Sequence, residues 1–451
     1  MRISATKPLF AWECLDDSPS LVTLKEFLAA IPDAKLLESL RRSRGKGRDD
    51  YPVQVLWGVL LLTTALRHPT IEACLAELRR NGGLRRLIGI ESEDQVPKKW
   101  NVSRFQDVLG QEPHVTHLKE IFQAIIQLLG SVVTYIGKHT AGDATGLSAH
   151  RKDEVGAAAE VAEGLPQASG GRKEYTDDAG NVTEVVEWFG FKLHLLVDAR
   201  HEVALAYEIT DTKAGDGETL PTVLAQAQAN LPAGRIETLA YDKAADTNDV
   251  HELLSAEGIK PVIQNRKLWK EEPLRMLPGH DGNSNIVYDE SGTVFCYDRV
   301  SEPMVRHAMA YIGHEPDRQA LKYRCPAMHE GWQCPMSAIC NAGKTYGKTV
   351  RIPREIDLRR FPELPRATKK FERLYKGRTA VERVNSRLKV FWGVDDGNIR
   401  GSRRFFAQVG VVMVVHAAFA SLLATAPRYE GRLGKMSLTP IAKALRAKLA
   451  A

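Results

Sequence analysis

The segment from Phe405 to Ala426, FFAQVGVVMVVHAAFASLLATA, runs for 22 residues without an Asp, Glu, Lys or Arg. A helix of that length could cross a bilayer, so this segment must either span a membrane or be buried by the rest of the chain. Gln408, His416, Ser421 and the many alanines favour burial inside protein, and no second apolar run accompanies it. We therefore expect a long core helix, and no membrane partner.

Charge is distributed unevenly along the 451 residues, although the net charge is only +6. Residues 351–451 carry 22 Lys and Arg against 8 Asp and Glu, and residues 35–104 carry 14 against 8. Residues 105–350 carry 23 Lys and Arg against 35 Asp and Glu. Basic flanks around an acidic centre fit a protein whose ends hold a polyanion and whose centre gathers carboxylates for metal. A basic surface without a partner would give the same counts.

The N-terminal sequence MRISATKPLFAWECLDD turns acidic too early for a signal peptide, so we expect a cytoplasmic protein with reduced cysteines. Cys14 and Cys74 are predicted core residues. Four further cysteines, separated by 28, 8 and 5 residues, are Cys296, Cys325, Cys334 and Cys340. Their spacing differs from the close pairs of a zinc ribbon. A structural zinc ion is one hypothesis for them, and half-buried thiols are the alternative.

Hydrophobic patterns divide the chain into regions of different character. Up to residue 130 the runs are helical, with Thr70 and Ser103 as expected N-caps and basic pairs that could contact phosphates. Strand and helix patterns then alternate. A strand that ends in a turn is expected within 131–146, further strands over 189–199, 202–210, 236–242 and 260–265, and helices over 217–231 and 247–258. A Gly/Ala-rich stretch, 156–182, is expected to be a mobile loop.

The alternation predicts an α/β fold with a mixed sheet. We divide the chain into an all-helical N-terminal domain (1–130), a catalytic domain in two segments (131–264 and 366–427), a strand-rich insertion (265–365) and a basic tail (428–451).

One stretch, YKGRTAVERVNSRLK, is expected to be a continuous helix with a polar stripe. The signature stripe consists of Tyr375, Arg378, Glu382 and Lys389. At about 100° per residue these side chains fall within roughly 60° of one another. On its own the stripe could be a solvated ladder of ion pairs.

Two aspartates follow predicted strands, Asp143 in TAGDATG and Asp242 in IETLAYDK. Strand ends can converge at one edge of a sheet, where Glu382 from an adjoining helix could join them. Three such carboxylates would repel one another unless a cation offsets them, and oxygen ligands of this kind select Mg²⁺ or Mn²⁺. His194 is expected to line this site rather than bind metal. Asp211 and Asp216 are expected to form a turn and cap a helix.

The signature stripe matches all four positions of a YxxRxxxExxxxxxK motif, so the chain resembles the DDE transposases of bacterial insertion sequences. The order of Asp143, Asp242, an insertion and then the signature helix is similar to the ribonuclease-H-like layout of that family over residues 130–425. The sequence YDKAADTND lacks the Gly-Tyr that many relatives carry after the second aspartate. Some relatives use a Trp of the insertion to capture a flipped base when a DNA hairpin forms. No Trp lies between Trp332 and Trp392, so this role cannot be assigned here, and the sequence leaves open whether a hairpin intermediate forms.

The resemblance implies a role for each matching residue. Asp143, Asp242 and Glu382 would bind two Mg²⁺ or Mn²⁺ ions, while Arg378 and Lys389 would hold phosphates of the transposon end. Tyr375 would help to position the terminal nucleotide. The implied partner is double-stranded DNA, both transposon ends and target, bound near the nucleoid by a homodimer assembled on the ends.

Two other functions remain open from the sequence. One is a catalytically inactive or repurposed transposase relative that binds DNA, and the other is a stand-alone nuclease on the same fold. The sequence does not identify the terminal inverted repeats, the target preference, or whether the element is active.

Overall fold

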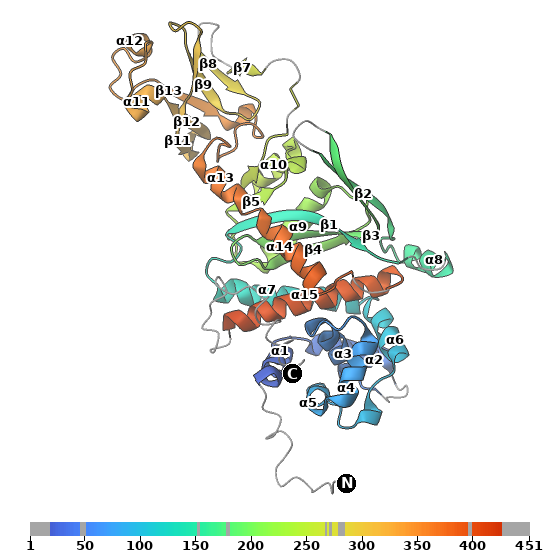
Figure 1. The fold of residues 1–451 in the computed structure, drawn as a ribbon. Coiled ribbons are helices and arrows are strands. Elements are labelled where there is room, and N and C mark those ends of the chain that lie inside the picture. Colours follow the sequence, from blue (N-terminus) through green and yellow to red (C-terminus); the bar gives the residue numbers. More distant parts are fainter. Residues whose placement is uncertain are drawn as a thin grey trace.

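The computed structural model describes residues 19–45, 51–150, 154–176, 181–266, 268–269, 273–277, 285–395 and 399–425. Figure 1 shows three parts in succession: N-terminal helices at one end, a large sheet with its helices in the middle, and a smaller β-rich part at the other end. Predictions that concern Cys14 and the basic tail lie outside the described residues.

The N-terminal part is helical, as the sequence predicts. Its helices are α1 (Pro19–Ala29), α2 (Ala34–Arg44), α3 (Val53–Ala65), α4 (Ile71–Arg80), α5 (Gly82–Arg86), α6 (Lys99–Leu109) and α7 (His114–Val132). Thr70 caps α4 as predicted, because its Oγ1 accepts a hydrogen bond from the Ala73 amide at 3.1 Å. The prediction for Ser103 was wrong, since α6 begins four residues earlier, at Lys99.

The apolar run forms the long helix α15 (Ser402–Thr425), which packs against α7, α6, α3 and α1 (Figure 1). Its length and composition would suit a bilayer, yet 94% of its most apolar window is buried inside the protein. Phe419 stacks between Phe27 and Trp392, with ring centroids 4.4 and 5.4 Å away. The prediction of a core helix is confirmed.

His416 shows how completely α15 is enclosed. Its side chain is inaccessible to solvent, and its Nε2 accepts a hydrogen bond from the Ala204 amide at 3.1 Å. Burial, with a smaller effect from the Arg387 charge, lowers the pKa of His416 to about 3. The imidazole is therefore neutral and joins α15 to the central sheet without placing a charge in the core.

The central sheet has six strands: β1 (His139–Ser148), β2 (Ser169–Thr176), β3 (Val182–Asp198), β4 (Ala204–Thr210), β5 (Thr238–Tyr241) and β6 (Lys260–Ile263). Their order is β2-β3-β1-β5-β6, with β4 also paired to β3. Strand β3 is antiparallel to β1, β2 and β4, whereas β1, β5 and β6 are parallel. The mixed sheet is therefore as predicted.

Helices pack against this sheet from several points in the sequence. Helix α9 (Asp216–Asn230) contacts β3 and β4, and α10 (Asn248–Ala256) contacts β6. Helices α13 (Lys369–Lys376) and α14 (Thr379–Ser386) return from the far end of the chain, and α14 contacts β1 and β3. Figure 1 shows these two helices crossing the sheet.

Two local predictions were wrong. The first strand begins at His139 and not at residue 131, because α7 extends to Val132. The stretch 156–182 is not simply a loop. It contains most of α8 (Glu154–Ala162) and all of β2, which pairs with the first half of β3.

The β-rich part contains two small sheets. Strands β7 (Leu274–Met276), β8 (Ile286–Asp289), β9 (Val294–Asp298) and β10 (Val305–Ala308) form one, and β11 (Ala310–Glu315), β12 (Ala320–Arg324) and β13 (Thr349–Pro353) form the other. Two short helices follow β12, α11 (Pro326–Glu330) and α12 (Ser337–Cys340). A hydrophobic cluster that includes Tyr288, Leu321 and Phe361 is separate from the main core. The domain boundaries themselves stay a prediction.

A buried ionic cluster joins the β-rich part to the sheet. The solvent-inaccessible side chain of Asp246 accepts hydrogen bonds from Arg359 Nε at 2.9 Å, Arg366 Nη2 at 2.8 Å and His251 Nε2 at 2.9 Å. Burial alone would raise the pKa of Asp246, but the His251 hydrogen bond and the two guanidinium groups outweigh it and hold that pKa at about 2. We call this group the Asp246 cluster.

Candidate active site

The two predicted aspartates lie on neighbouring strands at the same level of the sheet. The parallel pairing of β1 with β5 matches Ala141 with Ala240, so Asp143 stands level with Asp242, the residue that follows β5. Parallel neighbours are about 4.8 Å apart. Asp143 lies inside β1 rather than after it, which corrects the prediction, because β1 continues to Ser148 to pair with β3.

A glycine allows this close packing. A Cβ on Gly142 would lie 2.2 Å from Cε2 of Tyr241, so a larger residue would displace the ring that precedes Asp242. The sequence "GD" in β1 thus places the first carboxylate directly beside the turn that carries the second.

The environment of Asp143 disfavours its negative charge. Burial raises the pKa of Asp143 to about 6, the Lys173 charge opposes this shift, and the charges of Asp216 and Asp242 add to it. An acid with such a pKa in a group of carboxylates is typical of a site that receives a cation.

Asp216 belongs to the same electrostatic environment, which the sequence did not predict. It is the first residue of α9, and its Oδ1 lies 3.6 Å from Lys192 Nζ and 3.8 Å from His194 Nδ1. The expected capping role falls instead to Glu218, which accepts a hydrogen bond from the Gly215 amide at 3.2 Å. Asp211 does form the expected turn, accepting from the Lys213 amide at 2.8 Å.

His194 lies buried on β3, where its Nε2 is 2.9 Å from Thr210 Oγ1. Burial lowers its pKa, which the Asp216 charge partly offsets. A mainly neutral imidazole next to Asp216 fits the expectation that His194 lines the site.

The signature stripe does not lie on one unbroken helix. Helix α13 ends at Lys376, α14 begins at Thr379, and a π-helical turn follows over Arg387–Phe391. The prediction of a continuous helix was therefore wrong. The break leaves Gly377 and Arg378 between two helices, and the π-helical turn rotates Lys389 relative to an α-helix.

Each residue of the stripe has a defined contact. The Tyr375 ring stacks on Phe371 with centroids 5.9 Å apart, and Arg378 Nη2 lies 2.6 Å from Glu382 Oε1. Lys389 Nζ donates to the Gly146 carbonyl of β1 and lies 3.9 Å from Asp395 Oδ2.

The structure brings the stripe and the aspartates into one electrostatic neighbourhood. Burial lowers the pKa of Arg378, but electrostatic interactions with Glu382, Tyr375 and Asp143 outweigh this effect, so the net shift of the pKa is upward. The pKa of Tyr375 is raised by burial and, among smaller effects, by Asp242. Glu382 itself is half exposed and paired with Arg378. Within the part of the chain that the structure describes, no three His, Cys, Asp or Glu side chains are placed to hold a metal ion together.

The four cysteines of the β-rich part line one small cavity of about 20 Å³. Burial, with the other three cysteines adding to it, raises the pKa of Cys296 to about 12, which keeps that thiol protonated. No three of these cysteines are placed to hold a metal ion together, so zinc at this position is not supported. Reduced thiols in a small core fit the arrangement. Cys74 is fully buried, as predicted.

The fold and the site define an α/β protein with carboxylates at one level of a mixed sheet and a polar helical segment packed beside them. The family model described as a transposase DDE domain matches residues 136–417. A second model, described as a transposase domain, matches residues 14–107. The chain therefore belongs to the DDE transposase family, as the sequence predicts.

Other comparisons add less. No curated protein matches this chain significantly. One similar solved structure is the cryo-EM structure of piggyBac transposase in a synaptic complex with hairpin DNA. The two chains are 13% identical, 97% of this chain and 81% of that chain are covered, and the TM-score is 0.40. That score is too low to support an argument about this protein.

Proposed function

We propose that this protein is a transposase that cleaves transposon ends and joins their 3′-hydroxyl groups to target DNA, using divalent metal ions held by Asp143, Asp242 and Glu382. The observation that carries the proposal is the β1–β5 register, which sets Asp143 level with Asp242, together with the packing against β1 of α14, the helix that carries Glu382. The strand order β4-β3-β1-β5-β6, with β3 antiparallel to its neighbours, supports a ribonuclease-H-like fold.

The donor set fits the proposed metal. Carboxylate oxygens suit Mg²⁺ or Mn²⁺, and the raised pKa of Asp143 reflects a burial and charge repulsion that a cation would relieve. Such ions, when bound in pairs, activate the attacking oxygen and stabilise the leaving oxygen of a phosphodiester.

The protein's own side chains then have separate tasks. Arg378 exchanges its Glu382 partner for a phosphate of the transposon end, which frees Glu382 to turn toward the aspartates. Lys389, held beside β1 by the Gly146 carbonyl, contacts a second phosphate. Tyr375, supported by Phe371, positions the terminal nucleotide. Two protomers on paired ends would couple cleavage to assembly, near the nucleoid in the cytoplasm.

The test compares Glu382→Gln with the matched control Glu372→Gln. Glu372 is an exposed acid of α13 that pairs with Lys376 at 2.7 Å, in the same i,i+4 spacing as Glu382 and Arg378. We expect Glu382→Gln to bind end DNA in Ca²⁺ normally but to lose Mg²⁺-dependent cleavage on the order of 10³-fold. The measurements are a gel shift and cleavage of a labelled end.

The control Glu372→Gln should cleave like the wild type. If Glu382→Gln also cleaves at the wild-type rate, the Arg378–Glu382 pair is an ordinary surface ion pair and the third carboxylate is misassigned. Binding without cleavage by the wild type would instead indicate an inactive relative. Cuts without joined products would indicate a nuclease.

A further inference from the structure

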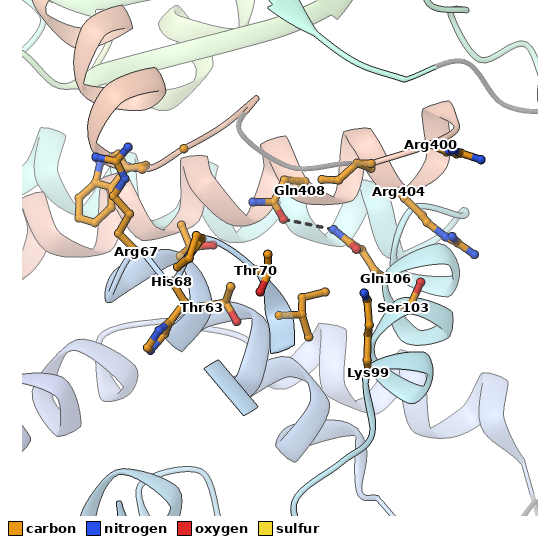
Figure 2. Close-up of a pocket in the computed structure, with 16 residues that line it drawn as sticks. Thr63, Arg67, His68, Thr70, Lys99, Ser103, Gln106, Arg400, Arg404 and Gln408 are labelled. Carbon is orange, nitrogen blue, oxygen red and sulfur yellow. Dashed lines mark hydrogen bonds between the residues drawn. The ribbon is translucent and has the colours of Figure 1, made fainter. Parts of the chain in front are cut away.

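A cavity of about 400 Å³ lies between the N-terminal helices and α15 (Figure 2), and neither Asp143 nor Asp242 lines it. Its walls come from α3, α4 and α6 on one side and from α15 and the segment after the π-helical turn on the other. The cavity therefore joins the parts of the chain that match two different transposase models.

The lining is strongly basic. Four cationic side chains contribute to it: Arg67, Lys99, Arg400 and Arg404. Among the described lining residues there is no Asp or Glu, although two of the cations pair with acids outside the lining, Glu72 and Asp107. Lys99 Nζ lies 3.1 Å from Glu72 Oε2, and Arg404 Nε lies 3.3 Å from Asp107 Oδ1. The described lining therefore carries a net positive charge.

Neutral hydrogen-bonding groups accompany these cations. Thr63, Thr70 and Ser103 line the cavity, and Gln106 and Gln408 bond to each other across it at 3.2 Å (Figure 2). That hydrogen bond links α6 to α15, so a ligand here would contact both walls at once.

Helix α4 also begins at the cavity, at Ile71, where its N-terminus favours an anion.

We infer that this cavity binds the phosphodiester backbone of a DNA strand and so couples the N-terminal helices to the catalytic part. Cations, hydroxyl groups and a helix N-terminus are together the chemistry that recognises phosphate. Trp392 and Gly393, which line the cavity, directly follow the π-helical turn that carries Lys389, so occupation of the cavity would hold the signature stripe in place. The inference rests on the proposed function only in naming DNA as the source of the phosphate.

The test uses the full-length protein with the double variant Lys99→Gln/Arg400→Gln, both exposed side chains whose loss should not disturb the core. The charge-matched control is Arg318→Gln/Lys344→Gln, two exposed residues of the β-rich part that lie outside the basic flanks and do not line the cavity. All proteins carry Glu382→Gln and are measured in Ca²⁺, so binding is read without cleavage. Melting temperatures check folding.

The readout is the dependence of affinity on salt for a labelled duplex of the transposon end. Loss of two phosphate contacts should weaken binding at least about tenfold at low salt and reduce the slope of log K against log salt by about two. The control variant should keep the wild-type slope. Equal slopes and affinities for the cavity variant and the wild type would overturn the inference.

A second arm separates DNA from a small phosphate-bearing ligand. Inorganic phosphate or a mononucleotide that raises the melting temperature of the parent at micromolar concentration, but not that of the cavity variant, would mean that the cavity serves a small molecule and would overturn the DNA assignment. A failure of the catalytic proposal would appear separately, as absent cleavage by the wild type with its salt slope intact.

Discussion

Individual residues of the site are placed at a cost to stability. Asp143 lies within a strand beside two other acids, and its pKa of about 6 is well above the ordinary value of 3.8. An acid with a raised pKa penalises folding once it ionises. The penalty develops as the pH rises from the unfolded pKa to about 6, and it is constant above that.

Asp143→Asn should therefore stabilise the metal-free protein above pH 6 by about 1–3 kcal/mol while abolishing cleavage. Chemical denaturation at pH 4 and pH 7.5 with EDTA measures this. The difference between the variant and the wild type should be small at pH 4 and larger at pH 7.5. A variant that is destabilised at both values would contradict the environment described for Asp143.

Asp246 is the opposite case, because the ionised form of this acid stabilises the fold. Removing its charge in Asp246→Asn leaves Arg359 and Arg366 buried without a counter-charge, which should cost about 3–5 kcal/mol. Because the Asp246 pKa is lowered, its contribution is complete above pH 4 and is lost as the pH falls toward 2.

Denaturant unfolding at pH 7 checks this expectation, with Asp317→Asn as the control because Asp317 is exposed near Arg318. Stability equal to the wild type for Asp246→Asn would show that the cluster does not hold the β-rich part in place.

Elements with a clear hydrophobic period were predictable, and those without one were not. Helix α15 is apolar on every side, and the buried strands β4, β5 and β6 are short apolar runs, so their burial follows from the sequence. Strand β2 and the first half of β3 are exposed, so no alternation marks them. The break at Gly377 was missed because the stripe keeps its spacing across it.

The sequence likewise singled out some residues of the candidate site and missed others. The motif singled out Tyr375, Arg378, Glu382 and Lys389, and the strand pattern singled out Asp143 and Asp242, but only the fold shows that Asp216 lies near Asp143. That neighbourhood depends on a contact between segments more than 70 residues apart, which a single sequence does not encode in a readable pattern.

The packing of helix α15 against the rest of the core gives a prediction about stability. Phe419→Ala should cost about 3–5 kcal/mol, because it removes a buried ring stacked between Phe27 and Trp392. Thermal unfolding measures it, against Val390→Ala, a change of a largely exposed side chain. A similar melting temperature for both variants would contradict the role of α15 as the common core.

The whole molecule combines a helical N-terminal part, a central sheet and a β-rich part, with α15 and the Asp246 cluster as the connections between them. The proposed reaction needs this arrangement, because DNA held by the basic ends must reach the carboxylates of the sheet. The charge distribution and the basic cavity agree with such a path. Binding to end DNA should accordingly fall steeply with salt.

The most direct test of the account is a strand-transfer assay with the purified wild-type protein, labelled transposon ends, a target plasmid and Mg²⁺, alongside Asp143→Asn. We predict that the wild type joins the ends to the plasmid, with a short target duplication at each insertion after repair, and that Asp143→Asn yields neither cuts nor joined products. Joining by Asp143→Asn at the wild-type level, or cleavage without any joining by the wild type, would contradict the account.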